Sequence, residues 1–137
     1  LYYEGRGVKQ DYEQAFYWIS KSANQGNLQA QYSLGYLYAT GKGTAQDFQL
    51  AYEWYLKAAQ QGYGMALNNL GMMYFEGQGR SKNLVIAYIL FCLATDTQYE
   101  LAPANKVKTE LQLSPTQITE AITLAKKWQK GQPLPLL

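Results

Sequence analysis

Four side chains in this sequence could do chemistry: the carboxylates of Asp11, Asp47 and Glu76, and the thiol of Cys92. A carboxylate can serve as a general acid or base, and a thiolate as a nucleophile. The chain has no histidine, so imidazole metal ligands and a Ser–His or Cys–His pair are excluded. Cys92 is the only cysteine and cannot form an internal disulfide. Because no neighbouring residue offers the electropositive setting that a reactive thiolate needs, we interpret Cys92 as a packing residue.

Three Gly-x-Gly segments, at 5–7, 41–43 and 77–79, superficially suggest phosphate-binding loops. Each follows an expected helix and not a strand, and each lacks the Lys-Ser/Thr ending of a P-loop. We therefore predict turns. The formal net charge is +2, which is too small to favour nucleic acid or an anionic membrane as a partner. No apolar run approaches the ~20 residues that span a bilayer, so we expect no membrane insertion.

The elements that would position these residues repeat every 36 residues. Gly5, Gly41 and Gly77 share this step, as do Ala15, Ala51 and Ala87, and Trp18 aligns with Trp54. In this register Asp11 and Asp47 align with Asn83. Asparagine preserves a helix N-cap but cannot act as a general base.

The register therefore assigns Asp11, Asp47 and Asn83 to helix N-caps. Glu76 occupies the same repeat position as Glu4 and Thr40, and such a change between polar side chains is typical of a solvated turn. We predict no catalytic residue, no metal ligand and no cofactor, so the chain is not expected to be an enzyme.

Each repeat indicates a helix, a turn and a second helix. Ala30, Leu34 and Tyr38 share one helical face, and Asp47 would begin the next helix. The sequence predicts an all-α domain over residues 1–130, followed by an extended tail over 131–137. Within the domain we expect a truncated repeat at 1–26, repeats at 27–62 and 63–98, and two capping helices at 99–130. The chain opens in the middle of the pattern, so we expect it to be a fragment of a longer protein.

The pattern A-x-x-x-L-G-x-x-Y-x-x-G-x-G, then D-x-x-x-A-x-x-W-x-x-x-A-A-x-x-G, resembles the Sel1-like repeat, a branch of the tetratricopeptide superfamily. The matching residues are Ala30, Leu34, Gly35, Tyr38, Gly41, Gly43, Asp47, Ala51, Trp54, Ala58, Ala59 and Gly62. The resemblance implies a right-handed α-solenoid of antiparallel helix pairs in which the first helix of each unit lines a concave groove. In bacteria, such relatives occur in signalling, envelope and host-interaction settings. They usually serve as adaptors that gather partner proteins.

Carrying over the inward positions of the first helices gives a candidate partner-binding groove. It comprises Gln29, Tyr32, Tyr36, Met65, Asn68, Met72, Phe75 and Glu76. Aromatic, thioether and amide side chains suit a peptide or protein partner. The alternative is that several of these rings only pack between helices. Residues 27–40 and 63–76 contain no Lys or Arg, so a basic clamp for a C-terminal carboxylate is not expected there.

Two other roles stay open. The chain could be a structural terminal segment of a longer repeat array attached to another domain. It could also form a homodimer through its truncated N-terminal face, if Phe16 and Ile19 are exposed there.

Overall fold

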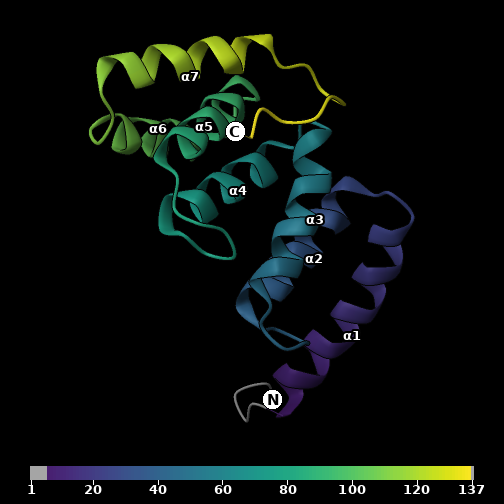
Figure 1. Ribbon diagram of the computed structural model, residues 1–137. Helices are drawn as coiled ribbons and strands as arrows, with labels where there is room; N and C mark the ends of the chain where they lie inside the picture. Colours follow the sequence, from purple (N-terminus) through teal and green to yellow (C-terminus); the bar gives the residue numbers. More distant parts are fainter. Residues whose placement is uncertain (1–5, 137) are drawn as a thin grey trace.

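The computed structural model describes residues 6–136, with side chains from Gln10 onward, and this part of the chain is all-α (Figure 1). Its helices are α1 (Arg6–Asn24), α2 (Leu28–Thr40), α3 (Phe48–Gln60), α4 (Gly64–Glu76), α5 (Leu84–Asp96), α6 (Ala102–Glu110) and α7 (Pro115–Lys127). None of the described helices is long and apolar enough to cross a membrane.

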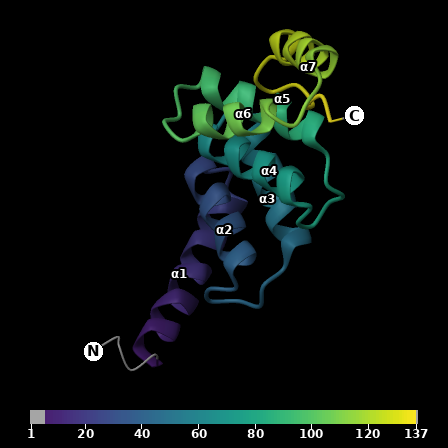
Figure 2. The same cartoon turned by 90° about the vertical axis from the view of Figure 1, so that its left-hand side faces the viewer.

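The helices stack in chain order. α2 packs on α1 and α3, α4 on α3 and α5, and α5 also contacts α6 and α7. Both views place α1 at one end of the stack and α7 at the other (Figures 1 and 2). This is the predicted α-solenoid of helix pairs.

Short polar residues begin the second helices, as the register predicted. The side chain of Asp47 accepts a hydrogen bond from the Leu50 N–H at 3.0 Å, and that of Asn83 accepts one from the Ile86 N–H at 3.0 Å. The prediction for Asp11 was wrong, because α1 begins at Arg6 and Asp11 lies inside it. In the later units the corresponding residues form a turn that rests on the preceding second helix, and no described helix precedes α1 to support such a turn.

That turn explains the second glycine of the Gly-x-Gly segments at 41–43 and 77–79. The turn predicted at 5–7 was wrong for its described residues, because Arg6 and Gly7 lie in α1. A Cβ added to Gly43 would collide with the Tyr12 carbonyl oxygen, and one added to Gly79 would lie 2.9 Å from the Phe48 carbonyl oxygen. Tyr12 and Phe48 occupy the same register position. Each turn therefore rests directly on the backbone of the previous unit, and only glycine allows that approach.

A second pair of glycines lets aromatic rings enter the helix pairs. Gly35 of α2 faces the Tyr55 ring, and Gly71 of α4 faces the Phe91 ring. Tyr55 is 3% exposed and Phe91 is fully buried. The core is deepest around α5, whose residues from Ile86 to Ala94 are all buried.

The last helix and the tail close the end of the stack. Ser114 forms a capping box with Gln117 at the start of α7. The tail then turns back toward α3, where the Gly131 N–H donates to the Gln60 carbonyl oxygen at 2.7 Å (Figure 1). Leu134 is only 7% exposed and joins the main core. The tail segment up to Leu136 is thus packed on the fold and does not project from it as a free end.

The expected exposure of Phe16 and Ile19 was also wrong. Both are partly buried against the cluster formed by Ala23, Ala30 and Leu34. The Phe16 ring meets the Tyr38 ring edge-on, with centroids 5.5 Å apart. The face of α1 that remains exposed carries other residues.

Candidate functional site

A hollow of about 510 Å³ lies between the C-terminal halves of α2 and α4. Its walls combine aromatic rings, thioethers, amides and hydroxyl groups, without a charged side chain among them. The lining residues are Tyr36, Ala39, Thr40, Gln46, Phe48, Tyr55, Asn69, Met72, Met73 and Gln78. Because an anion or a cation would find no counter-charge in these walls, the hollow suits a neutral ligand group.

Asn69 of α4 is the polar centre of this hollow. Its Nδ2 donates to the hydroxyl oxygens of Tyr32, at 3.4 Å, and of Tyr55, at 3.3 Å. These two bonds fix the carboxamide, and its Oδ1 makes no hydrogen bond within the described part of the chain. Burial raises the pKa of both Tyr32 and Tyr55 above the ordinary value, so both hydroxyls stay protonated and uncharged at neutral pH.

One cation stands at the rim. Lys42 of the α2–α3 turn donates from Nζ to the Tyr36 hydroxyl oxygen at 3.4 Å, and its ammonium group lies 5.3 Å from the centre of that ring. The hydrogen bond to Tyr36 is the main reason why the pKa of Lys42 is raised. Tyr36 itself is 40% exposed, so its ring is accessible at the mouth of the hollow.

The structure brings part of the predicted groove together here. Tyr36 and Met72 both line the hollow, and Tyr32 borders it through Asn69. The Tyr32 ring also packs against the rings of Tyr55 and Tyr63, with centroids 5.7 Å apart in each pair. Tyr32 therefore supports the wall and does not stand free in a groove.

The other predicted residues lie elsewhere. Asn68 is 5% exposed, and its Oδ1 accepts a hydrogen bond from Asn105 of α6 at 2.9 Å. Phe75 lies under the Lys108 ammonium group, and Glu76 is exposed at the end of α4. Gln29 lines a different hollow beside α1. Met65 is partly buried and lies outside the hollow between α2 and α4.

Sequence reasoning missed Asn69, Gln46 and Gln78. Asn69 directly follows Asn68, and the choice between them depends on helical phase, since one residue turns a helix by about 100°. Gln46 and Gln78 belong to the turns after the first helices. Gln46 follows the Gly-x-Gly segment at 41–43, and Gln78 is the middle residue of the segment at 77–79. These positions lie near the end of the predicted groove, but no sequence pattern indicates that the two side chains face it.

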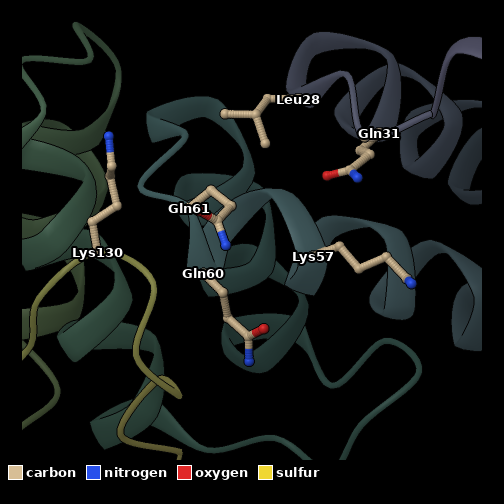
Figure 3. A pocket seen from close by; sticks show the side chains of 7 residues that line it. Leu28, Gln31, Lys57, Gln60, Gln61 and Lys130 are labelled. Atoms are coloured by element: carbon tan, nitrogen blue, oxygen red, sulfur yellow. The ribbon is translucent and has the colours of Figure 1, made fainter. Parts of the chain in front are cut away.

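A second hollow, of about 540 Å³, lies where the end of α3 meets the start of α2. Its lining includes Gln31, Lys57, Gln61 and Lys130. Figure 3 shows Lys130 and Lys57 on opposite sides of the pocket, with their ammonium groups pointing in different directions and not toward each other. The two cations therefore do not converge on a common ligand.

The thiol of Cys92 and the carboxylate of Asp47 have structural roles. Burial raises the pKa of the Cys92 thiol to about 11, so the thiol is protonated at neutral pH. Asp47 is engaged as an N-cap. Among residues 10–136, no group of three His, Cys, Asp or Glu residues is placed to hold a metal ion.

The repeated helix pair with its two glycine contacts agrees with the family comparison, in which the Sel1 repeat matches residues 1–27, 28–63 and 64–96. The chain belongs to the Sel1 repeat family. Sel1 repeat proteins are generally protein-interaction scaffolds and are typically not enzymes. No curated protein matches the chain closely enough to be counted as a relative.

Two solved structures of Sel1 type are similar to the chain. One is c5321, a protective antigen of uropathogenic Escherichia coli with an SLR fold, at 32% identity and a TM-score of 0.84 over 92% of this chain. The other is a Sel1 repeat protein from Oxalobacter formigenes, at 37% identity and a TM-score of 0.67 over 77% of this chain. The chain spans 27% of the first and 42% of the second.

Proposed function

We propose that this Sel1 repeat domain is an interaction scaffold that binds an uncharged peptide segment of a partner protein in the hollow between α2 and α4. The observation that carries the proposal is the combination of an entirely uncharged wall with one oriented amide, that of Asn69. An uncharged wall selects against acidic and basic segments, because burying an unpaired charge is costly.

The lining fits the chemistry of a peptide. The Oδ1 of Asn69 can accept a backbone N–H, while the amides of Gln46 and Gln78 offer both donors and acceptors. Tyr36 and Met72 provide apolar contact, and methionine adapts to side chains of different shape. Main-chain bonds then supply affinity and the apolar walls supply selectivity, as in other modes of peptide recognition.

Selection from a random 12-residue peptide library on the immobilised domain tests this proposal. We expect enriched peptides to carry few Asp, Glu, Lys and Arg residues in their common core. A Tyr36→Ala/Met72→Ala variant should weaken their binding at least about tenfold, since truncated interface anchors cost ≥ 2 kcal/mol at hot spots. The matched control is Gln29→Ala, which alters the hollow beside α1 and should leave affinity unchanged. Equal binding by the double variant, with its fold intact by circular dichroism, would refute the groove.

A second candidate function is structural: the chain would be the terminal segment of a longer repeat array attached to another domain. The packing of Leu134 and the Gly131–Gln60 hydrogen bond favour this role, because they seal one end of the stack. Under this alternative the library would yield no peptide that depends on Tyr36 or Met72.

Homodimerisation through α1 stays a prediction. The exposed large apolar side chains of that helix are those of Tyr17 and Trp18, whereas Phe16 and Ile19 are partly buried. Sedimentation velocity over a range of concentrations tests the prediction, and a monomer at the highest concentration would contradict it.

A further inference from the structure

Two lysines bracket the neutral hollow between α2 and α4. Lys42 lies at its rim, with its ammonium group 5.3 Å from the centre of the Tyr36 ring. Lys108 of α6 lies beyond α4, with its ammonium group 4.8 Å from the centre of the Phe75 ring. A lysine held over an aromatic ring keeps its charge in a preferred place. The uncharged walls are therefore flanked by two positioned cations.

The 36-residue register places the second cation in line with the hollow. Tyr36 of α2, Met72 of α4 and Lys108 of α6 occupy the same repeat position. Figure 2 shows these three helices following one another along the stack. Tyr36 and Met72 line the hollow, and Lys108 is exposed one helix further on. A segment that crosses the hollow from α2 toward α6 thus meets a cation at each end.

The helix spacing sets the length of such a segment. Neighbouring helices lie about 10 Å apart, so the two steps from α2 through α4 to α6 span about 20 Å. An extended peptide advances about 3.3 Å per residue, so about six residues cover this distance. The two cations are therefore too far apart for one carboxylate, and they suit two carboxylates at the ends of a short segment.

The acidic residues along this path leave both cations available. α2 contains no charged residue, and Glu76 is the only one in α4, where it is exposed at the end of the helix. In α6, Glu110 accepts a hydrogen bond from the hydroxyl of the buried Tyr88, so its carboxylate is engaged with α5. The path therefore offers positive charge at its two ends and an uncharged middle.

We propose that the partner segment carries an acidic side chain at each end of its uncharged core, about six residues apart, with one carboxylate at Lys42 and the other at Lys108. This inference rests on the proposed function, because it names the flanks of the segment whose core the hollow binds. Carboxylates at these places are attracted to cations that are already positioned, whereas basic flanks are repelled. The two lysines then select one class of partner among all segments with an uncharged core.

Three synthetic peptides that share the uncharged core selected from the library test the inference. They carry Glu, Ser or Lys at both ends of the core, and calorimetry measures their affinity for the intact domain. Exposed ion pairs are weak, so we expect the Glu-flanked peptide to bind about three- to tenfold more tightly than the Ser-flanked one. The Lys-flanked peptide should bind more weakly than either. High salt should remove these differences, because it screens exposed charges.

Variants of the domain locate the two contacts. Lys42→Gln and Lys108→Gln should each remove part of the gain from glutamate, and the double variant should remove all of it. Binding of the Ser-flanked peptide should not change in these variants. Lys130→Gln, at the other hollow, is the matched control and should leave all three affinities unchanged. Glu76→Gln removes the acidic residue of α4 and should not weaken the Glu-flanked peptide.

The Ser-flanked peptide separates the two possible failures. If it binds in a manner that depends on Tyr36 and Met72 but the Glu-flanked peptide binds no more tightly, the acidic flanks are refuted and the hollow stands. A gain from glutamate that survives in the double lysine variant would also overturn the inference. If no peptide depends on Tyr36 and Met72, the proposed function fails and this inference fails with it.

Discussion

Replacing Gly71 by alanine tests whether ring-into-helix packing holds the repeats together. A Cβ at this position would lie 2.6 and 2.9 Å from two carbons of the Phe91 ring, and Phe91 is fully buried. Helix propensity alone favours alanine by about 1 kcal/mol. An added methyl group in a packed core costs about 1–3 kcal/mol.

The contact distances decide which effect wins. Real Cβ atoms do not approach a ring this closely, and Phe91 is fully buried, so we place the cost at the upper end of that range. We expect Gly71→Ala to lower the free energy of unfolding by about 1–2 kcal/mol, as the difference between the two effects.

Urea denaturation followed by circular dichroism measures this change. A double-mutant cycle with Phe91→Leu provides the control. In the Phe91→Leu background the smaller side chain should remove most of the destabilisation caused by Gly71→Ala, which gives a coupling energy between the two positions of about 1 kcal/mol or more. If Gly71→Ala instead stabilises the protein by the amount that propensity predicts, the close-packing argument is refuted for this helix pair.

Three further changes test separate parts of the account. Gly43→Ala should lower the free energy of unfolding by more than about 1 kcal/mol in urea denaturation, because φ is +76° and the Tyr12 carbonyl blocks the new methyl group. Gly26→Ala is the control: φ is +91° there but the space is open, so its cost reports backbone strain without the steric clash. Asp47→Ala should cost about 0.5–2 kcal/mol through loss of the cap, while Asp47→Asn should cost much less. Burial raises the pKa of the Cys92 thiol from 9.0 to about 11, so the thiol should resist alkylation at pH 8 until urea unfolds the chain. The stabilisation linked to this raised pKa is complete below pH 9 and is lost as the pH rises toward 11. Fast alkylation of the native protein would contradict the burial of Cys92.

The sequence predicted the repeat, the helix pairs and the turns because these depend on local chemistry. Asp47 and Asn83 cap their helices as the register required, and the Gly-x-Gly segments at 41–43 and 77–79 are turns. The N-cap prediction for Asp11 was wrong, because α1 already begins at Arg6 and Asp11 lies inside it. Register alone transfers a role between units only where the neighbouring helices are also repeated.

The candidate site was predicted less well because it depends on packing between distant segments. Asn68 carries the same side chain as Asn69, but α6 covers the first and leaves the second beside the hollow. Nothing in the sequence near Asn68 indicates where Asn105 will lie. The burial of Leu134 has the same origin, since it depends on a tail that returns to α3 and not on any local pattern.

The methyl groups of the three methionines offer the most direct test of the binding site. Met72 and Met73 line the hollow between α2 and α4, whereas Met65 lies outside it. Methyl-labelled protein titrated with a peptide selected from the library should show large NMR shifts for Met72 and Met73 and little change for Met65. Shifts confined to Met65, or absent from all three while binding is demonstrated by calorimetry, would contradict the claim that this hollow binds the partner.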